Sequence, residues 1–92
     1  MKIWARVMRG HHILRDRVQA FDGERPTDLA GWNLVIGELC RPLDLARPIL
    51  LDKHLRELAR FGQTALRPAD FMEPVSFDRL EIELFPEKKK DQ

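Results

Sequence analysis

The stretch Met8-Arg9-Gly10-His11-His12-Ile13-Leu14, or MRGHHIL, joins two segments in which polar and apolar residues alternate. Alternation with a period of two is typical of a strand with one buried face, so residues 2–8 and 13–20 are predicted strands. Glycine readily adopts the positive φ that a tight hairpin turn requires. The stretch therefore predicts a β-hairpin whose two-residue loop is Gly10 and His11.

The length of that loop determines which residues of the two strands face each other. A two-residue loop pairs Val7 with Leu14 and gathers the apolar residues of both strands on one face. A loop one residue longer would pair Val7 with Arg15, because a slip of one residue turns every side chain to the other face. We therefore expect the two-residue register. Its one misfit is Asp16, which would face Ala5 on the apolar side.

Two helices are predicted after the hairpin. The first runs from a cap at Thr27 or Asp28 to about Arg41, and its apolar residues recur at helical spacing. The second covers residues 53–61, with Asp52 as a plausible cap and a glycine directly after its end. Both helices present one apolar side, so both are expected to pack on the sheet.

The last alternating segment, residues 77–85, predicts a third strand, whereas residues 63–68 are irregular or briefly extended. We expect a single α+β domain over residues 1–86 in the order β-β-α-α-β. Its three-stranded sheet consists of the N-terminal hairpin and the C-terminal strand, with two helices packed on one face. The first strand is expected to be central. The last strand is expected to be parallel to it if the helices run antiparallel, whereas a different helix arrangement would reverse its direction. Residues 87–92 predict a disordered polar tail.

Composition excludes several classes of protein. The chain has 92 residues, and its 16 basic and 15 acidic residues leave a net charge of +1, which provides no overall attraction to nucleic acid or anionic lipid. Cys40 is the single cysteine, so no internal disulfide is possible. Charges interrupt the N-terminal apolar residues, and no apolar run approaches the length of a membrane span. These features predict a soluble cytoplasmic protein.

The histidines and the cysteine do not form a metal-binding pattern. His11 and His12 are adjacent, so their side chains diverge, and the chain has no CxxC or HxxxH spacing. Cys40 lies on the core-facing side of the first helix. We therefore predict no metal and no cofactor, and we interpret the paired histidines as the solvated tip of the turn.

No catalytic motif is present either. The chain has neither a G-x-S-x-G elbow nor a glycine-rich phosphate loop, and we predict no catalytic residue. His54 is expected at the boundary of the second helix, with its ring packed and one nitrogen in water. An enzyme would need an enclosed pocket that gathers His54 with Asp70 or Lys53. Lys53, Arg56 and Arg60 share one side of the helix and could meet phosphates, although a solvated face is the favoured interpretation.

The outer face of the predicted sheet carries the most information about function. Exposed apolar side chains among charges mark interaction surfaces, in which Trp, Met and Arg are enriched. Trp4 would lie opposite Arg17, and Glu81 and Glu83 could neutralise the arginines, so a self-neutralised charged face is the competing interpretation. The predicted interaction surface consists of Trp4, Arg6, Met8, Ile13, Arg15, Arg17 and Phe85.

Two functions follow from this face. The first is a small non-catalytic interaction module that uses the outer sheet face for self-association or for a protein partner. The alternative is binding of RNA or another single-stranded nucleic acid, with bases stacked on Trp4 and phosphates bound by Arg6, Arg9, Arg15 and Arg17. The near-neutral charge and the two glutamates on the same face count against the alternative.

Three segments resemble a group of small uncharacterised proteins of clostridia-type bacteria. They are MKIWAR at residues 1–6, DKHLRELARFGQT at residues 52–64 and PADFMEPVSFDRLEIEL at residues 68–84. The resemblance implies a bacterial cytosolic protein of about this size. It implies no activity, cofactor or catalytic residue.

Overall fold

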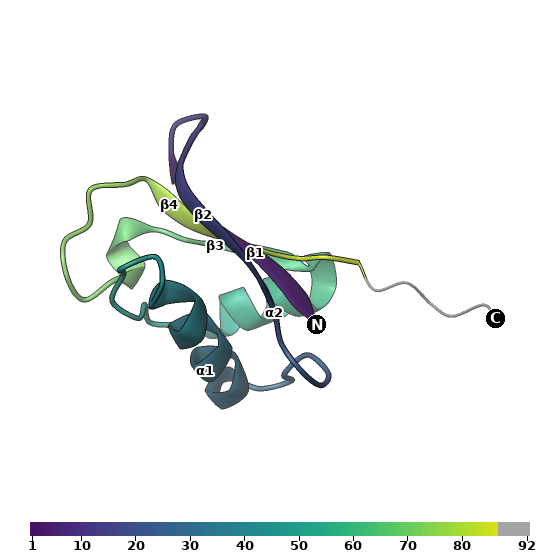
Figure 1. Cartoon of the computed structure of the whole chain (residues 1–92). Helices are drawn as coiled ribbons and strands as arrows, with labels where there is room; N and C mark the ends of the chain where they lie inside the picture. The colour runs from purple at the N-terminus through teal and green to yellow at the C-terminus, as the bar shows by residue number, and fades with distance from the viewer. Residues whose placement is uncertain (87–92) are drawn as a thin grey trace.

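The computed structural model describes residues 1–86, and the predicted polar tail at residues 87–92 lies outside the described residues. The predicted α+β class is confirmed, with two helices on one face of an antiparallel sheet (Figure 1). Within residues 1–86, no helix combines the length and apolar character needed to cross a membrane. The elements are β1 (Lys2–Arg9), β2 (His12–Ala20), α1 (Leu29–Cys40), α2 (Asp52–Phe61), β3 (Gln63–Leu66), the 3-10 turn η1 (Pro68–Asp70) and β4 (Arg79–Leu84).

The sheet has four strands rather than the three that we predicted. Its order is β2-β1-β4-β3, so β1 is central as expected, and β3 is the additional strand. β3 begins directly after Gly62, whose φ of 69° ends α2, and at four residues it is too short to show a clear alternation. β4 pairs antiparallel with both β1 and β3. The parallel direction expected for antiparallel helices is not observed, because the chain forms β3 and reverses once more before β4.

The hairpin keeps the predicted turn but not the predicted register. Arg9 pairs with His12 across Gly10 and His11, and Gly10 has a φ of 59°. Between Met8 and Val7 the register then shifts, because Leu14 is an extra residue in β2 that forms a bulge. Beyond the bulge Val7 pairs with Arg15, which is the pairing that the two-residue loop alone would exclude.

The bulge removes the misfit that the uniform register contained. A uniform register would place the Asp16 carboxylate opposite Ala5, on a face where Ala5 is fully buried. The structure instead pairs Asp16 with Arg6 on the opposite face of the sheet. On that face the Asp16 carboxylate accepts a hydrogen bond from the Trp4 indole at 2.8 Å, a contact that the uniform register would not allow, so the extra residue in β2 has a physical reason.

The core lies between the inner face of the sheet and the two helices. Ile3, Ala5 and Val7 of β1 are fully buried there, together with Trp32 and Leu58 of the helices. The first helix has the predicted cap, since the Asp28 side chain accepts a hydrogen bond from the backbone of Gly31. Cys40 is buried as predicted, and burial raises the pKa of its thiol to about 11 despite a neighbouring arginine.

Candidate functional site

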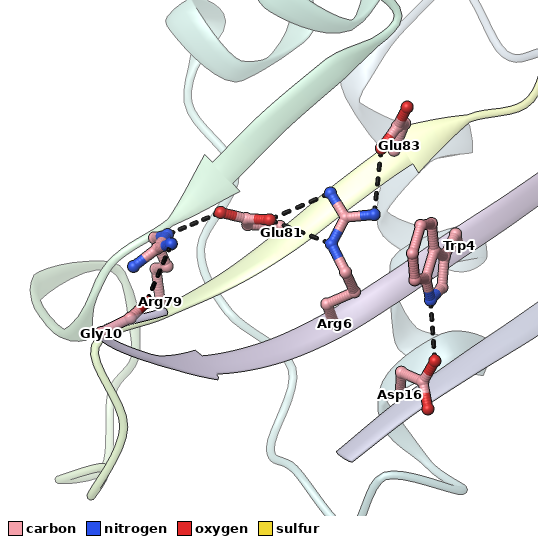
Figure 2. A network of polar contacts seen from close by, with 7 residues as sticks. All are labelled: Trp4, Arg6, Gly10, Asp16, Arg79, Glu81 and Glu83. Carbon is pink, nitrogen blue, oxygen red and sulfur yellow. Dashed lines mark hydrogen bonds and ion pairs between the residues drawn. The ribbon is translucent and has the colours of Figure 1, made fainter. Parts of the chain in front are cut away.

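The outer face of the sheet, which the helices do not cover, is organised around Arg6 (Figure 2). Its Nε donates to Oε1 of Glu81 at 3.0 Å, its Nη2 lies 2.9 Å from the same oxygen, and its Nη1 lies 2.9 Å from Oε1 of Glu83. The other Glu81 oxygen accepts from Nε of Arg79 at 2.6 Å. The Arg6 side chain is only 12% exposed, so its charge is neutralised by β4 rather than offered to solvent.

The Glu81 carboxylate joins the two arginines. Burial alone would raise its pKa, but hydrogen bonds from Arg79 and Arg6 and their positive charges outweigh that effect and lower the pKa below its ordinary value of 4.5. Glu81 is therefore ionised at neutral pH. The predicted neutralisation of the outer face by glutamates is present, with Arg6 and Arg79 as the partners.

Trp4 is fixed between a carboxylate and a guanidinium. Its Nε1 donates to Oδ2 of Asp16 at 2.8 Å, and Cζ of Arg6 lies 4.1 Å from the ring centroid (Figure 2). The predicted pairing of Trp4 with Arg17 is wrong, because the bulge places Val18 opposite Trp4. The cation over the indole ring is instead Arg6, two residues further along β1 on the same face.

Most of the predicted interaction surface lies on this outer face. Met8 is 8% exposed and thus hardly accessible, whereas its partner Ile13 is 47% exposed. Lys2 places its Nζ 5.1 Å from the ring centroid of Phe85. The residues that share the face as predicted are Trp4, Arg6, Met8, Ile13 and Phe85.

The predicted positions of Arg15 and Arg17 on the outer face are wrong. They pair with Val7 and Ala5, whose side chains face the core, so the bulge moves both arginines to the helix side of the sheet. Both remain exposed, because β2 is an edge strand that the helices do not cover. Asp16 and Val18 take their places on the outer face. The signal that could have revealed this exchange was the poor fit of Asp16 to the apolar face.

The histidine pair lies at the exposed tip of the hairpin, as predicted. His11 and His12 are both exposed. The backbone N–H of Gly10 donates to the Asp78 carboxylate at 2.6 Å, and its carbonyl accepts from Nη2 of Arg79 at 3.3 Å, which ties the turn to the start of β4. Among residues 1–86, no three His, Cys, Asp or Glu side chains are grouped so that they could hold a metal ion.

His54 is fully buried, which corrects the prediction that one of its nitrogens is in water. Its Nδ1 accepts a hydrogen bond from the backbone of Leu51 at 2.9 Å, so Leu51 rather than Asp52 precedes α2 as its cap. The remaining proton is then on Nε2, which lies 3.5 Å from Oδ2 of Asp70 without a well-formed hydrogen bond. Burial lowers the pKa of His54 below its ordinary value of 6.5, although the Asp70 charge acts in the opposite direction.

The structure thus brings His54 and Asp70 together, as an enzyme would require, but in a different setting. One ring nitrogen is occupied by the backbone, the other is buried, and a general base must reach a substrate proton. The pair therefore connects the start of α2 to η1, and its geometry fits a structural role.

The fold and the outer face define a small α+β domain with a four-stranded antiparallel sheet and a partly apolar, internally neutralised outer face. Comparison of the chain with protein-family models, curated proteins and solved structures gave no match. The resemblance to small clostridia-type proteins stays a prediction.

Proposed function

We propose that this chain is a small non-catalytic interaction module that uses its outer sheet face for self-association or for a protein partner. The supporting observation is two half-exposed apolar side chains of β2 on this face: Val18, which lies opposite the partly buried Trp4, and Ile13, which lies opposite Met8. Single exposed apolar residues are common, but a group of them on one uncovered face is typical of an interaction surface.

The charged network supports a protein partner over a nucleic acid. Arg6 is occupied by two carboxylates, and Arg15 and Arg17 lie on the face opposite Trp4. A single-stranded nucleic acid would need base stacking and phosphate contacts on one surface. The outer face instead has an apolar part on β2 and a neutral, ordered polar part on β1 and β4. This combination resembles the apolar core and polar rim of protein interfaces.

Sedimentation over a concentration series up to about 1 mM tests self-association, since interfaces of modest size fall in the micromolar to millimolar range. We expect association that Val18→Asp abolishes. Leu34→Asp is the matched control, because Leu34 is 69% exposed on α1, away from the sheet. A monomer at every concentration would contradict self-association. A protein partner would then have to bind the wild type and the Leu34 variant but not the Val18 variant, and equal binding by all three would refute the proposal.

A further inference from the structure

A hollow of about 370 Å³ opens in the helical layer, away from the outer sheet face. It lies between the segment that precedes α1 and the two helices, and its apolar walls are Pro26, Trp32, Leu55 and Ala59. Its volume is within the range of pockets that bind small molecules, and such pockets often lie between helices. The hollow can therefore accept a small apolar body between Pro26, Leu55 and Ala59, with Trp32, which is only 2% exposed, at its floor.

The charged residues at this hollow are of one sign. Arg25 and Arg56 line it, both are exposed, and no acidic side chain of residues 1–86 lines it. Neither arginine forms an ion pair with another described residue. Three other hollows, of about 200 to 310 Å³, each include at least one carboxylate, such as Glu81 or Glu38. In a chain with almost equal numbers of acids and bases, this hollow is distinguished by its two arginines without a carboxylate.

Arg25 also contacts α2 through its guanidinium. Its Nη1 lies 3.4 Å from the backbone carbonyl of Leu58 in α2, and a guanidinium has five N–H donors in a planar fork. The remaining donors can bind a carboxylate without loss of this contact. Arg56 projects from the same helix, and Thr27 adds a hydroxyl at the rim.

We propose that this hollow binds a small organic carboxylate whose apolar body lies against Trp32 and whose carboxylate is bound by Arg25 and Arg56. Guanidinium and carboxylate form strong, planar, charge-assisted hydrogen bonds, while the apolar body gains from leaving water. The inference does not depend on the function proposed for the sheet face, because the two surfaces are formed by different residues.

Titration of the ¹⁵N-labelled full chain with 2-naphthoate tests this site by NMR. Trp4 and Trp32 are the two tryptophans of the chain, so the indole N–H of Trp4 on the sheet face is an internal control. We expect a saturable shift of the Trp32 signal and none of Trp4. The neutral analogue 2-naphthalenemethanol should bind at least about tenfold more weakly, because it lacks the charge. No shift at Trp32, or equal binding of the two compounds, would overturn the proposal.

Two variants of α2 separate the arginine contact from general surface charge. Arg56→Gln should weaken 2-naphthoate binding about tenfold, which corresponds to the loss of one good charged contact. Arg60→Gln removes the same charge from the same helix outside the hollow and should leave the affinity unchanged. Both residues are exposed, so neither change should disturb the fold. Equal affinity of the two variants would refute the role of Arg56.

Discussion

The contact between Arg6 and Glu81 should contribute measurably to stability, whereas the contact between Arg6 and Glu83 should contribute little. All the donor–acceptor distances are 2.9 to 3.0 Å, so distance does not distinguish the two pairs. Exposure does, because the Glu81 side chain is 25% exposed and that of Glu83 is 42% exposed. Solvent weakens an ion pair more strongly when its charged side chains are more exposed.

The expected magnitudes follow from that difference. Arg6 places two nitrogen atoms close to Glu81, and the pair is partly buried. Its coupling free energy should therefore lie between the roughly 1.5 to 3 kcal/mol of hydrogen bonds to charged groups and the roughly 0.2 to 1 kcal/mol of exposed ion pairs. We expect a coupling free energy of about 1 to 2 kcal/mol for Arg6 and Glu81. For Glu83, screening should reduce the coupling to below about 0.5 kcal/mol. The larger value would be a substantial part of the roughly 5 to 10 kcal/mol that stabilises a domain of this size.

Double-mutant cycles with urea unfolding measure these couplings. Arg6→Met keeps an apolar stem over Trp4 while it removes the charge, and it is combined with Glu81→Gln in one cycle and with Glu83→Gln in the other. The cycle cancels the free energy of the separate contact between Glu81 and Arg79, because Glu81→Gln removes that contact whether Arg6 is present or not. Addition of 1 M salt should reduce the Glu81 coupling only in part, because partly buried pairs are less screened. Equal couplings in the two cycles, or a Glu81 coupling below about 0.5 kcal/mol, would refute the reasoning.

Three further predictions concern the pKa of His54, the helix glycines and the bulge. Because the pKa of His54 is lower in the folded chain than its ordinary 6.5, the unfolded chain takes up the proton first and the free energy of unfolding should fall as pH drops below about 6.5. In urea titrations His54→Gln should flatten this slope, whereas the core variant Leu58→Ala should retain it; an unchanged slope in the His54 variant would contradict the assignment. Gly37→Ala should raise the free energy of unfolding by about 0.5 to 1 kcal/mol, since its Cβ would meet only the mobile end of an arginine at 3.2 Å. Gly31→Ala should lower the melting temperature, because its Cβ would lie 2.8 Å from a proline side chain, and calorimetry showing the same sign for both variants would refute this. Deletion of Leu14 should remove the bulge and leave the other hairpin pairs intact, which cross-strand NOEs would confirm and a slipped register would exclude.

Helix boundaries and the two faces of β1 were predictable because they depend on local periodicity. The alternation of Ile3, Ala5 and Val7 identified the buried face of β1, and the predicted helix ends, near Arg41 and before Gly62, agree with the structure to within one residue. β3 was not predictable in the same way. Its four residues contain no repeated pattern, and they become a strand because β4 supplies hydrogen-bonding partners.

The same distinction between local and long-range causes applies to the candidate sites. Trp4 and Arg6 were assigned to the outer face correctly because β1 is regular. The burial of His54 was missed because it depends on η1, which is distant in sequence and brings Asp70 to the ring. A histidine at a helix boundary has no sequence signal that distinguishes a wet nitrogen from a buried one.

The bulge at Leu14 shows why the register of a hairpin cannot be derived from its turn alone. The turn determines only the first pairs, here Arg9 with His12 and Met8 with Ile13. Each later pair also depends on the partners that its side chains find, and the extra residue in β2 brings the Asp16 carboxylate to the Trp4 indole. The bulge also changes the functional interpretation, because it places Arg15 and Arg17 on the helix side. A nucleic acid stacked on the outer face would therefore lose those cationic partners, whereas a protein would meet the apolar side chains that the bulge leaves exposed there.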